Sequence, residues 1–350
     1  MIRLLAIACL VVLTACGRID SHTPSPSAPP ASPIHPVSTA QATTTSQGWP
    51  RTLQTPSGPL TLKAPPQRIV STSVTLTGAL LSIDAPVIAS ASVRHTGGVS
   101  DQQGFFSQWG AIARARGVKA LYQGEVNADA VLAMQPDLIV VAATGGDSAL
   151  KAKAILSTIA PVLVVNYDDR RWQDVATLLG TATGHEQRAA ELSQQFARDI
   201  RALRQQAVLP AQPVTAMVYN DDGSGANIWT PESAQGRLLQ EIGLQLAPLP
   251  ASLRQQTVAL GRRDIIPVSG ERFAEALQGH DLLLFATDDH SVGQLLANPL
   301  LTNLPAVQAR RVYALGADTF RLDYYSASHL LARLARQYSK TTPNHEQPAS

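Results

Sequence analysis

The hydrophobic positions of this chain fall into short apolar runs separated by amphipathic stretches, beginning near residue 66. A run without alternation, such as 137–141, is typical of a strand covered on both faces of a parallel sheet. The predicted strands are 68–72, 86–90, 137–141, 162–166 and 214–219. The predicted helices between them include 75–83, 128–134 and 148–159. This alternation predicts an α/β fold made of successive βα units.

The longest periodic stretch lies at 183–208. Its apolar residues, spaced by four and three positions, are Leu192, Phe196, Ile200 and Leu203. Residues at that spacing share one face of a helix. Thr183 and Glu186 have the spacing of a capping box, which predicts the start of this helix. Pro210 lies beyond its predicted end.

The pattern before this helix recurs weakly after it. Segments 129–147 and 275–289 share the end of a helix, an aspartate, an apolar strand and a polar loop. The recurrence indicates two related lobes, although generic βα periodicity would also produce it. We therefore predict two Rossmann-like α/β lobes with central sheets, at 49–182 and 209–340. The connecting helix at 183–208 joins them, and a ligand cleft lies between them.

The N-terminal residues 1–15 combine one early arginine with an apolar run and small residues, which is typical of a secretory signal peptide. The sequence Leu13-Thr14-Ala15-Cys16 resembles a bacterial lipobox, which predicts cleavage before Cys16 and a lipid anchor on that cysteine. A plain signal peptide with an incidental cysteine is the alternative. After cleavage Cys16 would be the one cysteine left, with no partner for a disulfide.

Composition separates the ends of the chain from the lobes. Residues 16–48 are rich in Pro, Ser and Thr, so we predict a disordered tether that cannot bury enough apolar surface to fold. Residues 341–350 are predicted to be a disordered tail. The net charge is +2 and there is no basic run, so nucleic acid is not an expected partner.

One short motif suggests an enzyme. Ser148, in GGDSAL (145–150), resembles the nucleophile block of some esterases, and its spacing to Lys151 fits the serine–lysine pair of penicillin-binding enzymes. An activated serine also needs a base and an orienting carboxylate, and no companion motif occurs. A glycine-rich loop that opens a helix, with Asp147 or Ser148 as its cap, is the simpler interpretation. We predict that the protein is not an enzyme and keep an exported serine hydrolase as the alternative.

The histidines do not form a metal site. They occur singly, with no pair at helical spacing, and Asp288-Asp289-His290 is the nearest approach to a ligand cluster. This cluster is more typical of a loop after a strand. We predict no direct protein ligand for a metal ion.

Two predicted loops carry aromatic residues that could contact a ligand, and one of them also carries an arginine. Trp229 precedes a helix start with an early proline, Thr230-Pro231-Glu232-Ser233. It either packs on that helix or faces the crevice at the carboxyl end of a strand, where ligands bind in α/β folds. Arg321 lies between Phe320 and the pair Tyr324 and Tyr325, which either pack the last helix or face the same crevice.

Five long blocks carry a resemblance to a known family. They are QRIVSTSVTLTGALLSIDAPVIAS (67–90), PDLIVVAATGGDSAL (136–150), STIAPVLVVNYDD (157–169), WTPESAQG (229–236) and NPLLTNLPAVQARRVYALGADTFRLDYYSA (298–327). They closely resemble the periplasmic ferric-enterobactin-binding proteins of enteric bacteria. The likeness covers nearly all of residues 49–338.

The resemblance implies the substrate-binding component of an ABC importer, with two lobes that move little on binding. Such a protein takes a ferric catecholate siderophore in the periplasm and delivers it to an inner-membrane permease with its ATPase. Iron would enter only as the bound ferric siderophore, with no other cofactor. We expect a monomer in the periplasm, anchored to a membrane through Cys16. Another iron chelate or haem is the alternative ligand, and haem would require an axial Tyr, His or Met.

The chemistry of such a ligand matches the two aromatic loops. A tris-catecholate iron complex is anionic and exposes flat rings, so arginines supply charge and aromatic side chains stack on the rings. The chelator already saturates the iron. By the resemblance, Trp229 and Arg321 contact the ligand, and Arg262 occupies a basic position of the family. Tyr325 is predicted to face the crevice beside Arg321.

The chain departs from the family at one position. Gly98 stands where the family has an arginine. Arg94 is predicted to reach the same space, and a changed ligand preference is the alternative. The family also docks to its permease through one carboxylate on each lobe. By position these are Asp129 and Glu271, which are equally suited to be ordinary helix-capping residues.

Overall fold

The computed structural model describes residues 48–168, 170–220, 222–254 and 264–339, which belong to one compact unit. Two residues with predicted roles, Cys16 and Arg262, lie outside the described residues. So do the predicted signal peptide, nearly all of the predicted tether, and the predicted tail. In the described part of the chain, no helix is long and apolar enough to cross a membrane.

The first lobe is built on a parallel sheet with the strand order β5-β4-β3-β6-β7. Its strands are β3 (Ile69–Ser71), β4 (Val87–Ser92), β5 (Lys119–Gln123), β6 (Leu138–Ala142) and β7 (Val162–Val165). β6 and β7 are buried along their whole length, as predicted for unalternating apolar runs. An antiparallel hairpin, β1 (Arg51–Thr55) and β2 (Gly58–Leu62), precedes the sheet.

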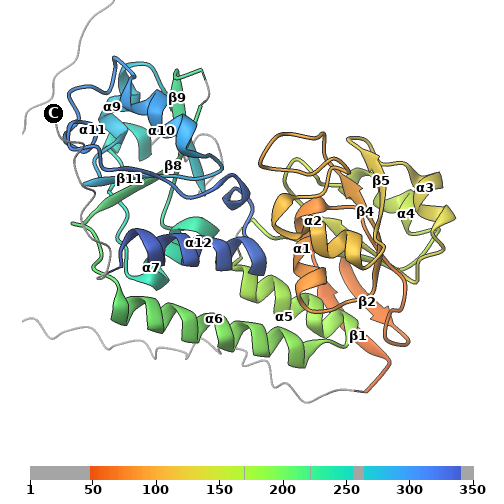
Figure 1. Ribbon diagram of the computed structural model, residues 1–350. Helices are drawn as coiled ribbons and strands as arrows, with labels where there is room; N and C mark the ends of the chain where they lie inside the picture. The colour runs from red at the N-terminus through yellow and green to blue at the C-terminus, as the bar shows by residue number, and fades with distance from the viewer. Residues whose placement is uncertain (1–47, 169, 221, 255–263, 340–350) are drawn as a thin grey trace, which may run out of the picture. The chain divides into compact units, whose positions relative to one another are not determined.

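Helices cover this sheet (Figure 1). They are α1 (Val74–Ser82), α2 (Ser107–Ala115), α3 (Ala128–Ala133), the 3-10 turn η1 (Leu150–Ala152), α4 (Lys153–Leu156) and α5 (Trp172–Thr183). Asn127 caps α3 as predicted, because its side chain accepts a bond from the Ala130 amide. The helix predicted at 148–159 is instead η1 followed by the short α4.

The long helix is α6 (Glu186–Gln206), and its predicted apolar stripe is buried. The predicted capping box is wrong. Thr183 is the last residue of α5, and its hydroxyl donates to the Leu179 carbonyl within that helix. Gly184, at a φ of 82°, ends α5 in the left-handed conformation that glycine adopts readily. Two helices separated by a glycine therefore occupy the region where the sequence predicts one capped start.

The second lobe has a mixed sheet with the order β10-β9-β8-β11-β12. Its strands are β8 (Val214–Tyr219), β9 (Gly225–Trp229), β10 (Ile265–Ser269), β11 (Asp281–Leu284) and β12 (Val312–Ala314). β8, β11 and β12 are parallel, whereas β9 runs antiparallel to both of its neighbours. The two lobes thus share an α/β design without sharing one strand topology.

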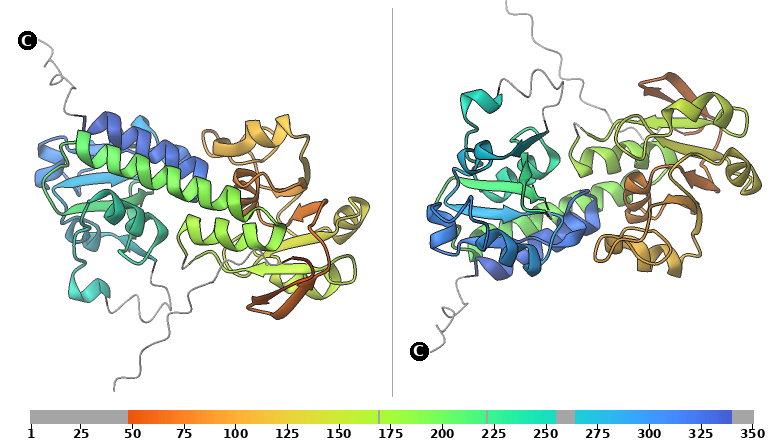
Figure 2. Two further views of the ribbon diagram at one scale, coloured as in Figure 1. Left: turned by 90° about the horizontal axis from the view of Figure 1, so that it is seen from below. Right: turned by 90° about the horizontal axis from the view of Figure 1, so that it is seen from above.

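The helices of the second lobe include α7 (Ala234–Ile242), α9 (Glu271–Ala276), α10 (Asp289–Leu296), α11 (Pro305–Gln308), the turn η2 (Ala317–Thr319) and α12 (Tyr324–Gln337). Figures 1 and 2 show α12 lying alongside α6. The first turn of α12 also packs on the first lobe, because Tyr324 contacts Trp172 with ring centroids 5.6 Å apart. Both long helices therefore join the lobes.

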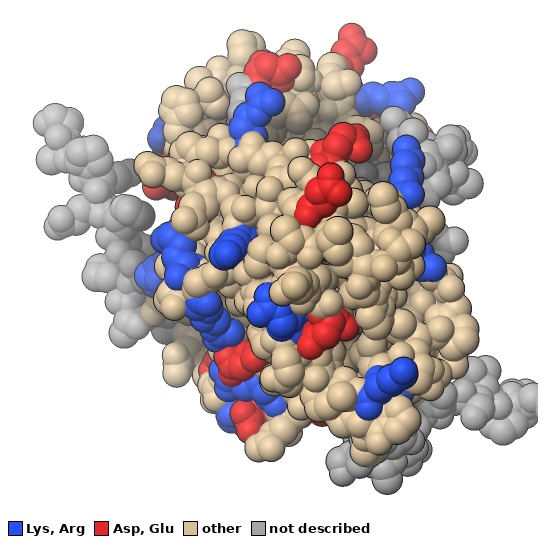
Figure 3. Space-filling model, turned by 90° about the vertical axis from the view of Figure 1, so that its right-hand side faces the viewer, with Lys and Arg blue, Asp and Glu red and all other residues tan. Residues whose placement is uncertain are grey.

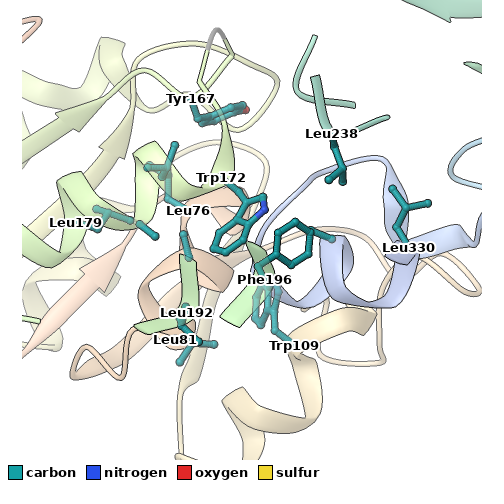
Figure 4. Close-up of a cluster of buried hydrophobic side chains, with 14 of the residues drawn as sticks. Leu76, Leu81, Trp109, Tyr167, Trp172, Leu179, Leu192, Phe196, Leu238 and Leu330 are labelled. Carbon is teal, nitrogen blue, oxygen red and sulfur yellow. The ribbon is translucent and has the colours of Figure 1, made fainter. Parts of the chain in front are cut away.

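One continuous apolar core runs through this junction (Figure 4). Trp172 and Phe196 meet edge to face with ring centroids 5.1 Å apart, and Leu238 and Leu330 of the second lobe belong to the same cluster. Two smaller clusters lie on the far faces of the two sheets. A shared core of this kind resists separation of the lobes, because opening it would expose apolar surface.

Candidate functional site

A single carboxylate organises the first lobe's part of the site. Asp147, in the loop after β6, accepts hydrogen bonds from the Ser73 hydroxyl (2.5 Å), the Thr75 amide (3.0 Å) and the Tyr167 hydroxyl (2.6 Å). Burial alone would raise the pKa of Asp147, but these hydrogen bonds outweigh it and hold the pKa below its usual range. Asp147 is therefore ionised at neutral pH and ties three segments together.

Tyr167 supplies the aromatic wall of this lobe. It follows β7, and its side chain is only 8% exposed. Burial and the neighbouring Asp147 charge raise its pKa, so the phenol stays protonated and donates to Asp147. No local sequence pattern indicates a role for Tyr167, because its partners Ser73 and Asp147 come from other segments.

Arg321 and the aromatic residues around it form the second lobe's part. The guanidinium carbon of Arg321 lies 4.8 Å from the Phe320 ring centroid and 5.4 Å from the Tyr167 ring centroid. Trp229, the last residue of β9, lies 5.9 Å from Phe320 and 6.3 Å from Phe285 by ring centroids. Arg321 therefore joins the aromatic residues of both lobes.

These side chains line a cavity of about 50 Å³. Its walls come from α1, the segment 167–172, α5, the end of β9, the start of α7 and the segment 320–322. The lining residues are Thr75, Leu76, Ala79, Tyr167, Asp168, Arg170, Trp172, Val175, Trp229, Ala234, Gln235, Asp264, Phe320, Arg321 and Leu322. Figure 4 shows Tyr167 above Trp172, with the nitrogen edge of the indole on the side of Leu238.

Unsatisfied donors gather at this cavity. In the described part of the chain, the buried side-chain nitrogen and oxygen atoms without a hydrogen-bond partner are those of Trp109, Tyr122, Trp172 and Trp229. Trp172 and Trp229 line the cavity and are 4% and 5% exposed. A buried donor without a partner is costly, so these indole N–H groups favour a ligand with acceptor oxygens.

A second hollow of about 370 Å³ lies wholly in the first lobe. Its lining comes from the carboxyl-end side of β3, β4, β5 and β6 and includes the exposed Arg94. Burial raises the pKa of Tyr122, whose hydroxyl faces no partner, to about 12. Asp147 lines this hollow and Tyr167 lines the cavity, so their hydrogen bond separates the two spaces.

The segment that carries Arg321 is held through its backbone. Arg333 donates to the Leu315 carbonyl (2.9 Å), Gln235 to the Phe320 carbonyl (2.7 Å) and Ser326 to the Arg321 carbonyl (2.8 Å). Next to these, Asp318 binds Arg333 (2.6 Å) and His329 (2.7 Å). The position of Arg321 thus depends on several independent contacts.

The structure brings together two of the predicted ligand residues, since Trp229 and Arg321 line one cavity. Tyr325 does not line it. Its ring packs against Tyr324 at 5.6 Å, and burial raises its pKa to about 12. The predicted role of Tyr325 beside Arg321 in ligand binding stays a prediction. The first two residues of α12 turn their rings into the packing between helices.

Arg94 lies in a different part of the first lobe from the cavity, and its predicted role stays a prediction. It borders the second hollow and not the cavity that holds Arg321. Gly98 has a φ of 78°, and a Cβ added there would lie 3.0 Å from the Cβ of Ala317 in the second lobe. A larger residue at position 98 would be strained in this backbone.

The two carboxylates expected to dock the permease are both exposed. Asp129 lies in the first turn of α3, and Glu271 is the first residue of α9. Each lobe therefore presents one of them at a helix start. On the face that Figure 3 shows, acidic and basic side chains are interspersed and form no continuous patch of one sign.

Ser148 is not arranged as a nucleophile. Its hydroxyl donates to the Ala142 carbonyl (2.8 Å) and accepts a long bond from the Leu150 amide (3.4 Å). Within the described ranges, no cluster of three His, Cys, Asp or Glu residues is placed to hold a metal ion.

Two α/β lobes joined by a long helix, with a site between their sheets, define a class of extracytoplasmic binding proteins. The periplasmic binding protein family matches residues 83–319, and the chain belongs to this family. It is 54% identical over 286 residues to the ferric enterobactin-binding periplasmic protein FepB of Escherichia coli O6:H1. That alignment covers 82% of this chain and 90% of FepB. The predicted family resemblance is confirmed.

Solved structures agree with the fold. The crystal structure of holo-ViuP has a TM-score of 0.76 and 36% identity, over 84% of this chain and 96% of that one. Staphylococcus aureus SirA complexed with staphyloferrin B has a TM-score of 0.63 and 18% identity, over 82% and 97% of the chains. At that identity the likeness concerns the fold alone. The predicted two-lobed α/β fold with a connecting helix is confirmed.

Proposed function

We propose that the protein binds a ferric catecholate siderophore of the enterobactin type in the periplasm and delivers it to an inner-membrane ABC permease for iron uptake. The observation that carries this proposal is the cavity in which Arg321, Trp229 and Tyr167 meet. The 54% identity to a protein named for ferric enterobactin binding supports the same ligand class.

The lining chemistry suits an anionic, ring-bearing complex. Arg321 and Arg170 supply positive charge and paired donors for phenolate oxygens. The aromatic walls offer ring faces, and each guanidinium–ring contact adds roughly 0.5–2 kcal/mol. Iron that is saturated by its chelator needs no protein ligand, so iron enters this proposal as part of the ligand and not as a cofactor.

The cavity must enlarge to take such a ligand. Its volume is about 50 Å³, whereas pockets for ligands of moderate size are roughly 300–1,000 Å³. Arg321 and Phe320 lie between this cavity and a smaller one that also contacts Val99 and Phe106. A rotamer change of these two side chains would join the two spaces, and further movement of side chains or loops would be needed to reach that volume.

The remaining assignments complete the proposal. Arg94, beside the second hollow, is positioned to contact an anionic edge of a ligand that extends past Tyr167. Arg262 keeps its proposed basic role by resemblance. The exposed carboxylates Asp129 and Glu271 are proposed to bind arginines of the permease, one from each lobe. We further propose a monomer that is anchored to a membrane through Cys16.

A fluorescence titration with ferric enterobactin tests the proposal. Trp229 and Trp172 line the cavity, so binding should quench tryptophan emission. Arg321→Ala should weaken binding by about 10- to 100-fold, because a charge-assisted contact is lost. Arg198→Ala, an exposed arginine on α6, is the matched control and should leave the affinity unchanged. Absence of quenching in the wild type, or equal affinities of wild type and Arg321→Ala, would refute the assignment.

A further inference from the structure

The GGDS loop (145–148) has no role in the function proposed so far. We propose that Asp147 is a positioning residue of the ligand site. It holds Tyr167 so that the ring presents its face to the ligand while its hydroxyl stays bound to the carboxylate. The inference rests on the proposed function, in which the chelator already saturates the iron.

The first argument is the number of elements that Asp147 joins. One oxygen accepts from the Ser73 hydroxyl and the Thr75 amide, at the start of α1, and the other accepts from Tyr167 after β7. Ser73 is also the cap of α1. Because one ionised group satisfies donors from two other segments, the position of Tyr167 is fixed relative to α1, which lines the same cavity.

The second argument is the close approach of the loop backbone. A Cβ added to Gly145 would lie 1.9 Å from the Tyr167 hydroxyl oxygen, and Gly145 has a φ of 85°. Any side chain at this position would displace the hydroxyl or break its bond to Asp147. Gly145 therefore leaves room for the Tyr167 hydroxyl, and Asp147 accepts its hydrogen bond. The same loop contains Ser148, which the sequence pattern suggested as a nucleophile.

The third argument concerns iron. A tyrosine binds ferric iron as the deprotonated phenolate, as in haem proteins with a tyrosine ligand. Here the proton of Tyr167 is engaged by a carboxylate, and both burial and that negative charge favour the protonated phenol. Tyr167 thus contacts the ligand as a neutral ring facing Arg321, 5.4 Å from its guanidinium carbon. Because Tyr167 stays protonated, it would not coordinate an iron ion that has an open coordination position.

A competing explanation makes the opposite prediction. If Asp147 acted only through its charge, it would repel an anionic siderophore, and removing the charge would tighten binding. If it positions Tyr167, removing the charge weakens binding although the ligand is anionic. The sign of the change in affinity therefore separates the two explanations.

The test is a double-mutant cycle on the Kd for ferric enterobactin, with the melting temperature of each variant measured alongside. Asp147→Asn should weaken binding by about 5- to 20-fold, near the lower end of the loss of a charged hydrogen bond, because the asparagine oxygen can still accept from Tyr167. Tyr167→Phe, which removes the other end of the bond, should weaken it by a similar factor. The double variant should be within about twofold of either single variant, because both break one interaction.

Two further measurements complete the design. Asp199→Asn on α6, a charge change that lies outside both hollows, should leave the Kd unchanged. The visible absorption of the bound ferric complex should be the same in the wild type and Tyr167→Phe, since no iron–tyrosinate bond exists.

Tighter binding by Asp147→Asn, additive losses in the double variant, or a spectral change in Tyr167→Phe would each overturn the inference. These failures differ from failure of the proposed function. In that case the wild type itself would not bind ferric enterobactin, and the inference would fall with it.

Discussion

The two halves of the site are held in different ways. In the first lobe, one carboxylate, Asp147, fixes Tyr167 through a side-chain bond of 2.6 Å. In the second lobe, Arg333, Gln235 and Ser326 each bond a different backbone carbonyl of the segment that carries Arg321. The position of Tyr167 therefore depends on one carboxylate, whereas the position of Arg321 depends on three separate hydrogen bonds. A single substitution among the residues that hold Tyr167 should therefore weaken binding more than a single substitution among the residues that hold Arg321.

The largest effect is expected from Gly145→Ala. The new methyl group would overlap the Tyr167 hydroxyl, and the positive φ adds strain of about 1–3 kcal/mol. We expect at least about tenfold weaker siderophore binding and a lower melting temperature. Gly117→Ala is the matched control, since Gly117 also has a positive φ but no atom within 4 Å of an added Cβ.

The control separates backbone strain from the clash with Tyr167. Gly117→Ala should lower the melting temperature without a change in siderophore affinity. If Gly145→Ala lowered only the melting temperature as well, the first half of the site would tolerate displacement of Tyr167, and the contrast between the halves would be lost.

An intermediate effect is expected in the second lobe. Asp318→Asn weakens the contacts with Arg333 and His329 but leaves the Gln235 and Ser326 bonds in place. The siderophore affinity should change by less than about threefold, while the free energy of unfolding falls by about 1–3 kcal/mol. Calorimetry and the fluorescence titration measure the two quantities. A tenfold loss of affinity would show that this half also depends on one group.

The smallest effect on siderophore binding is expected from a substitution of Asp323, at the junction of the lobes. Asp323 does not line the cavity, and its substitution should change the stability of the protein instead. Burial raises the pKa of Asp323, the cap of α12, to about 6, although the Ser326 amide and Gln108 of α2 donate to it. An ordinary aspartate has a pKa of about 3.9. Between these values the folded state binds more protons than the unfolded state, so Asp323 lowers stability as the pH rises through this window.

Asp323→Asn should remove that dependence, because asparagine also caps helices. We compare the free energy of unfolding of the variant with that of the wild type by denaturant unfolding. The value of the variant minus that of the wild type should rise by about 1–3 kcal/mol from pH 4 to pH 7. Asp288→Asn, at the exposed cap of α10, is the matched control for replacing a capping aspartate by asparagine. A relative stability of Asp323→Asn that stays flat with pH would show that water reaches the Asp323 carboxylate.

Much of the fold could be predicted from local patterns. The buried strands β6, β7 and β8 follow the predicted apolar runs, and α6 ends where the sequence predicts. The errors occur at the ends of helices, where a local pattern allows more than one boundary. Thr183 continues α5 and does not cap α6, and the expected helix at 148–159 is shorter.

The sequence by itself determined the α/β class, the long helix and the family, because each is written in contiguous residues whose periodicity or block pattern can be read directly. It also singled out Trp229 and Arg321, which share one cavity. Only the tertiary structure decided that Tyr325 packs between helices, that Arg94 borders another hollow, and that Asp147 cradles Tyr167. The reason is physical: these contacts join segments far apart in the chain, and their partners are set by how the lobes fold and not by local spacing.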